Sequence, residues 1–184
     1  MLQITIPETE LFDEARQEFI YVNKPVTLTL EHSLVSISKW ESKWKKRYIT
    51  DENDDQKTAE EVIDYIRCMT ITQNVDPNVY YALTEDNYRE IEEYIKDGHT
   101  ATTFQEVGNV RKNGEGISSE LVYYWMCAYQ IPFEAQKWHF NRLMTLIRIA
   151  GIKNSPDKKM NKFDAMRQQT ELNALRRAKA KSKG

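Results

Sequence analysis

Glycine is scarce in this sequence, with six residues in a chain of 184. Loops that bind nucleotides need glycine, because it alone lets the backbone come close to a phosphate group. Neither G-x-G-x-x-G nor G-x-x-x-x-G-K-[ST] occurs, and the segment Asn113-Gly114-Glu115-Gly116 lacks both a preceding strand and a following lysine. The sequence therefore predicts no phosphate-binding loop.

Histidine and cysteine are also rare. His32, His99 and His139 are far apart, and H-E-x-x-H, H-x-x-x-H and C-x-x-C are all missing, so the ligand spacing of a metal site is not met. We expect His139 at a helix surface or at the edge of the core. Cys68 and Cys127 both fall in helical apolar patterns, which predicts buried free thiols and a reducing cytosol.

The residues needed for catalysis are not arranged in a recognisable pattern. Nucleophilic catalysis requires a serine or cysteine activated by a base, and no G-x-S-x-G elbow occurs. Burial within an apolar segment would raise the pKa of Cys127 and suppress its reactivity. The paired carboxylates at 60–61 and 92–93 fall on solvated helical faces rather than alone in apolar runs. We predict a protein that is not an enzyme and that uses no cofactor or metal.

Long hydrophobic runs are missing too. No window approaches the roughly 20 apolar residues of a membrane-spanning helix. The segment 1–7 has no basic region ahead of an apolar stretch, so we expect neither a signal peptide nor a membrane partner. Hydrophobic residues make up 40% of the chain and charged residues 29%, which is enough apolar material for the core of one domain.

Charge is present in quantity but is unevenly distributed. The net charge is −2, yet residues 155–184 hold nine lysines and arginines against three acids, a balance of +6. The remaining chain is therefore at −8, and such asymmetry bears on partners. The basic tail leaves three interpretations open: a solvated terminus, a surface for an acidic protein partner, or a nucleic-acid contact. Aromatic residues do not alternate with these charges, which disfavours single-strand binding.

The apolar pattern changes its period along the chain, which predicts an α+β fold that is predominantly α-helical. Period two over residues 1–31 indicates a small N-terminal β unit of two or three strands. Period 3.6 then begins, with Leu34, Ile37, Trp40, Trp44 and Tyr48 on one helical face. We expect one α-rich domain over 1–154, followed by a basic C-terminal helical arm over 155–184.

Capping residues predict where the next helices begin. Thr58 and Glu61 form a capping box, followed by an expected inward stripe of Val62, Ile63, Ile66 and Met69. Asp76-Pro77 predicts a short helix through Tyr81, and Thr84 predicts another that ends near Gly98.

Residues 99–116 should form a long loop, because glycine and asparagine punctuate them. Ser118-Ser119 should then begin an apolar helix that reaches Tyr129. We expect a single further helix from Pro132 to Gly151, with Phe133 facing inward, and a last polar helix from about 161 to 179.

Two aromatic segments, Tyr123-Tyr124-Trp125 and Trp138-His139-Phe140, have two interpretations. Buried aromatic rings contribute large apolar areas to a core. Tyrosine and tryptophan are also common in interface hot spots, so an oligomer or partner groove is the alternative.

Several stretches resemble, in their order along nearly the whole chain, a family of small tailed-bacteriophage proteins. They are 30–44 (LEHSLVSISKWESKW), 123–126 (YYWM), 131–134 (IPFE), 136–143 (QKWHFNRL) and 172–177 (LNALRR) with the ending Lys183-Gly184. Members are described as tail assembly chaperones or as phage structural proteins. Such a chaperone coats the helical tape measure protein while tail tube subunits polymerise around it.

The resemblance implies a non-catalytic chaperone in the host bacterial cytoplasm. Its expected partners are the tape measure protein, the tail tube protein and further copies of the chain. One alternative is a virion component in the tail, the head–tail junction or the capsid, and another is a small nucleic-acid-binding protein that uses the basic tail. A charge-polarised subunit could also stack head to tail. The candidate partner-binding residues are Trp40, Lys43, Trp44, Arg176, Arg177, Lys179 and Lys181.

Overall fold

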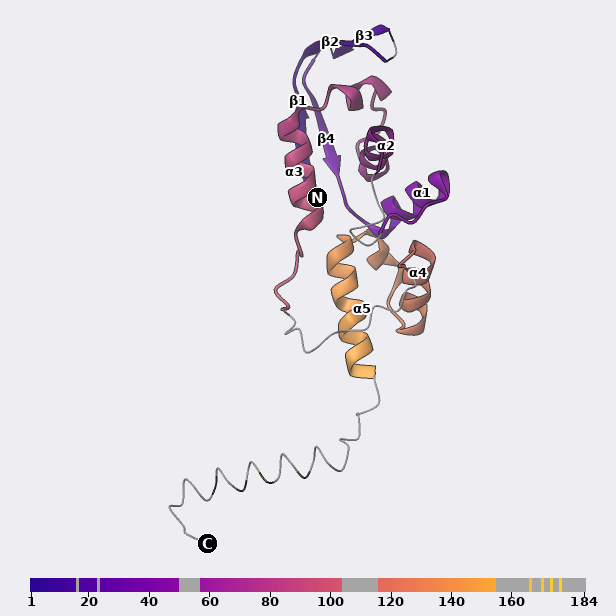
Figure 1. Ribbon diagram of the computed structural model, residues 1–184, viewed down its shortest axis with the longest axis vertical. Helices are drawn as coiled ribbons and strands as arrows, with labels where there is room; N and C mark the ends of the chain where they lie inside the picture. The colour runs from indigo at the N-terminus through magenta and orange to yellow at the C-terminus, as the bar shows by residue number, and fades with distance from the viewer. Residues whose placement is uncertain are drawn as a thin grey trace. The chain divides into compact units, whose positions relative to one another are not determined.

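The computed structural model describes residues 1–15, 17–22, 24–49, 57–103 and 116–154, together with Met166, Thr170, Asn173 and Arg176 (Figure 1). The chain divides into two units, Met1–Ala150 and Gly151–Gly184. The sequence had led us to expect the division four residues later. In the second unit the four described residues beyond 154 are helical and exposed.

The fold is α+β and predominantly helical, as the sequence predicted. A β unit occupies the first thirty residues, and helices follow it (Figure 1). The strands are β1 (Leu2–Ile6), β2 (Thr9–Asp13), β3 (Glu18–Val22) and β4 (Val26–Leu30). The α-helices are α1 (Leu34–Trp44), α2 (Ala59–Met69), α3 (Glu85–Lys96), α4 (Ser119–Ala128) and α5 (Phe140–Asn154), and the 3-10 helices are η1 (Pro77–Ala82) and η2 (Phe133–Lys137).

The four strands form two antiparallel pairs, β1 with β4 and β2 with β3. Leu2 lies opposite Leu30 in the first pair, and Thr9 lies opposite Val22 in the second. Two residues separate β1 from β2, whereas three separate β3 from β4. The connection from β3 to β4 is therefore one residue longer than the connection from β1 to β2. This extra residue shifts the register between the two strand pairs and interrupts their pairing, as a β-bulge does. Pro7 and Pro25 lie in these breaks and have no backbone N–H to donate.

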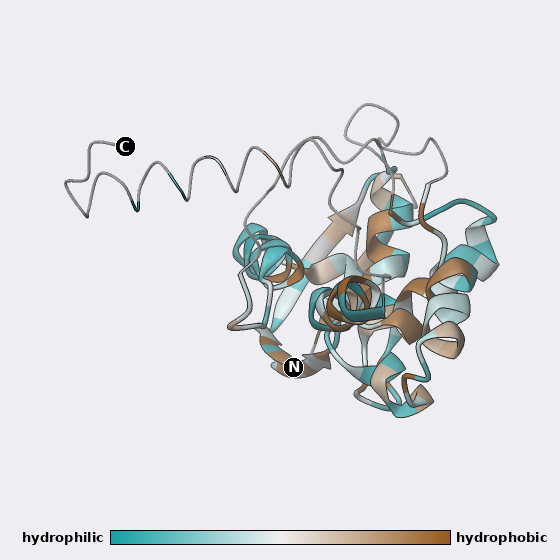
Figure 2. Ribbon diagram, turned by 90° about the horizontal axis from the view of Figure 1, so that it is seen from below, coloured by the Kyte–Doolittle hydropathy of each residue, from teal (hydrophilic) through white to brown (hydrophobic). Residues whose placement is uncertain are grey.

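One face of the β1–β4 pair forms part of the core. Ile4, Ile6, Leu28 and Leu30 alternate with polar residues and are buried, as expected for a two-sided strand. Helix α3 runs beside this pair and packs against β1 (Figure 1). Figure 2 shows hydrophobic and hydrophilic stretches alternating along the helices, as expected for elements that bury only one face.

Local capping defines the starts of the helices, and here the predictions are confirmed. Thr58 and Glu61 form the capping box of α2, and Thr84 forms a similar box at α3 with Asn87. The Asp76 side chain accepts a hydrogen bond at the start of η1, where Pro77 takes the first position. Each of these caps satisfies backbone N–H groups that the first helical turn leaves without partners.

The buried face of α2 differs from the predicted stripe. Val62 and Ile63 are only half-buried, whereas Tyr65 is buried with Ile66 and Met69. Glu61 and Asp64 are also buried on this helix. The face is rotated because α2 packs against α1, whose lysines and tryptophans need carboxylate and carbonyl partners.

The single helix expected from Pro132 to Gly151 is wrong. The segment divides into η2 and α5, with Trp138 in an extended backbone conformation between them. This break lets His139 form a β-bridge with Ser33, while the N–H of Phe140 donates to the carbonyl of His32 at 2.7 Å. Phe133, expected inside, is exposed.

The aromatic and cysteine predictions also need correction. Tyr124 is 66% exposed and Trp138 is 40% exposed, so the two aromatic segments are not entirely part of the core.

The cysteines, which were both expected to be buried, also differ from the prediction. Cys127 is exposed, because it lies on the outer face of α4, and Cys68 is half-buried. Burial, with a further contribution from Asp64, raises the pKa of Cys68 to about 11.

Candidate partner-binding site

Trp40, one of the predicted partner-binding residues, lies wholly inside the core. Its indole Nε1–H donates to the carbonyl oxygen of Glu61 at 2.8 Å, which ties α1 to the first turn of α2. A side chain without exposed area cannot contact a partner, so the expectation for Trp40 was wrong. The same helical periodicity that singled it out directs it inward.

Lys43 and Trp44 converge on one carboxylate of α2. The Lys43 ammonium and the Trp44 indole N–H both donate to Asp64, Trp44 at 2.9 Å. Lys46 forms a matching ion pair with Glu61, and its hydrogen bond lowers the pKa of that carboxyl. These contacts join α1 and the residues after it to α2, and they neutralise two of the five basic side chains between Lys39 and Arg47 that could otherwise face nucleic acid.

The structure describes one of the four predicted partner-binding residues of the basic tail. Arg176 is described, helical and exposed. Arg177, Lys179 and Lys181 lie outside the described residues, so their part in partner binding stays a prediction.

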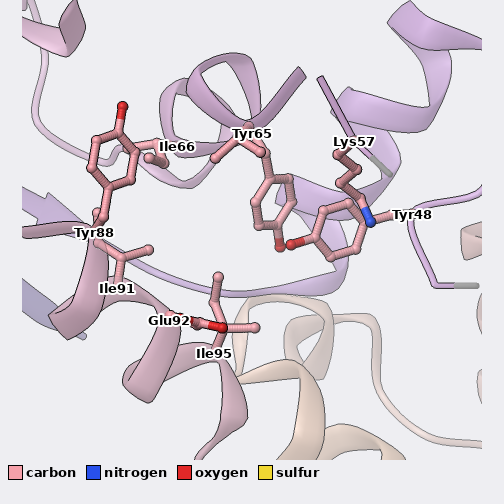
Figure 3. Close-up of a pocket in the computed structure, with 9 residues that line it drawn as sticks. Tyr48, Lys57, Tyr65, Ile66, Tyr88, Ile91, Glu92 and Ile95 are labelled. Carbon is pink, nitrogen blue, oxygen red and sulfur yellow. The ribbon is translucent and has the colours of Figure 1, made fainter. Parts of the chain in front are cut away.

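An open cavity of about 280 Å³ lies between α2 and α3 (Figure 3). Helix α3 contributes one wall, α2 contributes the facing wall, and the segments on either side of residues 50–56 close one end. Its lining is dominated by aliphatic and tyrosine side chains. The nine lining residues are Tyr48, Lys57, Val62, Tyr65, Ile66, Tyr88, Ile91, Glu92 and Ile95.

Stacked rings fix the end of the cavity nearest α1. Tyr48 stacks on Tyr65 with ring centroids 3.8 Å apart and planes inclined by 23°. The Lys57 ammonium lies 4.7 Å from the centre of the Tyr48 ring, within the range of a cation–π contact. Figure 3 shows these three side chains together at one end, opposite Tyr88.

The chemistry of the lining favours apolar contact rather than catalysis. Serine, cysteine and histidine do not occur among the nine lining residues. Burial raises the pKa of Tyr65 and Tyr88, so both phenols stay protonated near neutral pH. The cavity therefore offers aliphatic surface, ring faces and a few hydroxyl groups.

The solvent-facing surface of α3 is acidic, and one of its carboxylates, Glu92, also lines the cavity. Five exposed acidic residues face solvent along this helix: Glu85, Asp86, Glu90, Glu92 and Glu93. Two basic residues offset part of this charge, since Arg89 pairs with Asp86 and Lys96 pairs with Glu92. A partner carrying basic side chains beside its apolar ones would complement this acidic surface of α3.

Behind the cavity, the three histidines of the chain meet. His32 and His139 have ring centroids 5.2 Å apart, and His139 and His99 are separated by 4.1 Å. His32 shares a 2.5 Å hydrogen bond with the Tyr65 hydroxyl, so the row touches the cavity wall. His139 Nε2 lies 3.0 Å from the Tyr94 carbonyl oxygen, and the described residues offer its Nδ1 no hydrogen-bond partner.

Burial favours the neutral form of two of these histidines, His32 and His139. It lowers the pKa of His32 from 6.5 to about 3, helped by His139 and His99. Burial and His99 also lower the pKa of His139. Within the described part of the chain, no three histidine, cysteine or acidic residues are grouped so that they could hold a metal ion.

The sequence predicted some of the residues that line the cavity but not that they meet. Tyr48, Val62 and Ile66 were expected on apolar helical faces, whereas Tyr65 was missed. The meeting of the histidines also escaped detection, because ligand-spacing rules examine only neighbours in sequence. Tyr65 falls on the same helical face as Ile66 and Met69, which is the one signal that could have found it.

Comparison with protein-family models, curated proteins and solved structures finds no match to this chain. Among the described helices, none combines the length and the apolar character needed to cross a membrane.

Proposed function

We propose that this protein is a non-catalytic tail assembly chaperone that binds the tape measure protein of a tailed bacteriophage. We infer the family from the resemblance along the sequence, and we propose that the client binds in the cavity between α2 and α3. Helical clients are held when an apolar face enters a hydrophobic groove at positions spaced by three and four residues. The single observation that supports the proposal most is this apolar cavity, one wall of which is formed by the acidic helix α3.

The cavity is large enough for side chains of a client. Sites for drug-sized molecules and cofactors occupy roughly 300–1,000 Å³, and this cavity, at about 280 Å³, lies at the lower end of that range. It suits one or two large apolar side chains of a client helix. Basic residues flanking those anchors would lie against the acidic face of α3.

The proposal places the protein in the host bacterial cytoplasm during tail assembly, with the tail tube protein as a second partner. Its binding surface comes from α2 and α3 rather than from the tryptophans of α1. Lys43 and Trp44 support that surface indirectly, because they fix α2 through Asp64.

Co-expression with the tape measure protein of the same genome tests the proposal. We expect an otherwise insoluble client to become soluble and to elute with this protein in one complex. If the client stays insoluble and no complex forms, the chaperone function is wrong. Mass spectrometry of purified particles then checks the alternative, because a virion component would be present there in stoichiometric amount.

A cavity variant shows whether the contact occurs where we place it. Ile95→Glu puts a charge into the lining and should reduce client capture at least tenfold. Ile63→Glu is the matched control, because Ile63 is a half-buried isoleucine of α2 that does not line the cavity. Circular dichroism melts of both variants would show that each is folded. Equal client capture by the two variants would exclude the cavity as the binding site.

A further inference from the structure

The β2–β3 ribbon exposes an aromatic face. Phe12 and Phe19 lie opposite each other in the register, and their ring centroids are 5.0 Å apart. Tyr21 follows on the same face, 6.0 Å from Phe19. The three rings are 49%, 55% and 51% exposed. Large aromatic side chains grouped on a surface in this way are typical of a protein contact.

The opposite face of this ribbon packs against η1. Val22 is buried there, and β3 packs against η1. Side chains alternate between the two faces of a strand, so the contact with η1 directs Phe19 and Tyr21 outward. The aromatic face is therefore held in place by the body of its own unit.

Carboxylates accompany the exposed rings. Glu10 lies opposite Tyr21 in the register, and both border a hollow of about 170 Å³ that Glu8 also lines. Two carboxylates beside a tyrosine ring form a receptor for a lysine or arginine side chain, through ion pairing and cation–π contact. Residues 8–22 contain five acids and one arginine, a balance of −4.

This charge decides which partner fits. Two copies of the ribbon would repel each other, because like charges brought together across an interface are unfavourable. A basic segment that also carries apolar side chains would satisfy both the carboxylates and the rings. The chain contains such a segment at 155–184, with a balance of +6 and apolar residues at Phe163, Met166, Leu172 and Leu175.

We propose that the aromatic, acidic face of the β2–β3 ribbon binds the basic C-terminal arm, residues 155–184, of a second copy of the chain. The two surfaces differ, so the contact is heterologous, and repetition joins subunits head to tail. A row of subunits formed in this way would suit a long helical client. The contact itself needs no client, so it can be tested apart from the proposed function.

Sedimentation velocity of the full-length protein at low salt provides the test, with two charge-reversed variants. The ribbon variant is Glu8→Lys with Glu10→Lys, and the arm variant is Arg176→Glu with Arg177→Glu. We expect the native chain to self-associate and each variant alone to associate at least tenfold more weakly. Raising the salt concentration should weaken the native association, because exposed charges are screened.

Mixing the two variants is the decisive step. In the mixture, the native ribbon of the arm variant meets the native arm of the ribbon variant, so association should rise well above that of either variant alone. A matched control, Glu60→Lys with Glu134→Lys, makes the same change in net charge at exposed positions outside the ribbon and should associate as the native chain does.

The proposal is overturned if the native chain stays monomeric at low salt, if the ribbon variant associates normally, or if mixing restores nothing. Client solubilisation is measured separately. A ribbon variant that solubilises the client but does not self-associate would leave both proposals standing, and loss of solubilisation in the Ile95→Glu variant concerns only the cavity.

Discussion

His32 Nδ1 and the Tyr65 hydroxyl oxygen lie 2.5 Å apart in a buried hydrogen bond. The contact joins the turn before α1 to the middle of α2, 33 positions further along the chain. Tyr65 lines the cavity, while His32 begins the row that continues through His139 to His99. One hydrogen bond thus connects the histidine row to the wall of the cavity.

Stability should fall as the pH drops below about 6.5. The pKa of His32 is lowered to about 3 in the folded protein, so below 6.5 the unfolded chain binds a proton that the folded chain does not. The stabilisation is complete above 6.5 and is lost progressively down to about 3. For His32 alone the free energy of unfolding should decrease by about 2 kcal/mol at pH 5, and His139 adds to this. Urea unfolding at pH 7.5 and pH 5 measures the difference.

Nuclear magnetic resonance of the imidazole protons isolates the histidines from other groups. The His32 signal should keep its neutral chemical shift through pH 5 while the protein remains folded. Glu31, Asp97 and the Tyr94 hydroxyl face this row. The chemical shift of His32 reports on the His32 ring itself and not on these neighbouring groups. An ordinary titration of His32 near 6.5 would contradict the argument.

Replacing Trp40 should weaken the fold rather than a partner contact. Trp40→Ala removes a fully buried ring and the hydrogen bond to the Glu61 carbonyl, at an expected cost of about 3–5 kcal/mol. Trp40→Phe keeps most of the buried area and should cost less. Urea unfolding followed by circular dichroism gives both values. Native stability in Trp40→Ala would show that the residue is not in the core.

The capping box of α2 should contribute measurably to stability. Thr58→Ala removes the side-chain oxygen that accepts from the Glu61 N–H, at a cost of about 1 kcal/mol. Thr58→Ser retains the hydroxyl and is the matched control, which should stay within a few tenths of the native value. Chemical denaturation of the three proteins compares them. A loss of equal size in both variants would assign the effect to the methyl group instead.

Asp64 should matter more than either of its partners. Asp64→Ala leaves the Trp44 indole N–H without its acceptor and the Lys43 ammonium without its counter-charge. We expect a loss of about 1–3 kcal/mol in the free energy of unfolding. Lys43→Ala should cost about 1 kcal/mol or less, because Lys43 is 58% exposed and solvent screens its charge. The reverse order of the two losses would show that the exposed lysine, not the buried carboxylate, joins the helices.

Features that depend on a few neighbouring residues were determined by the sequence itself. Thr58 and Glu61 are three residues apart and reach each other within one helical turn, so the start of α2 could be predicted. The N-terminal β unit and the predominance of helix also followed from the apolar periodicity. The number of strands did not, because two or three were expected and the described residues form four.

Contacts between distant residues were decided only by the tertiary structure. The helix predicted from Pro132 breaks before α5 because His139 forms a bridge with Ser33, a residue more than 100 positions earlier. Trp40 and Trp44 share one helical pattern, yet only packing against α2 separates a fully buried ring from a half-buried one. The cavity and the histidine row likewise exist because separate helices and turns meet. Local sequence defines each element and its apolar face, but which faces meet depends on how all of them pack into a shared core.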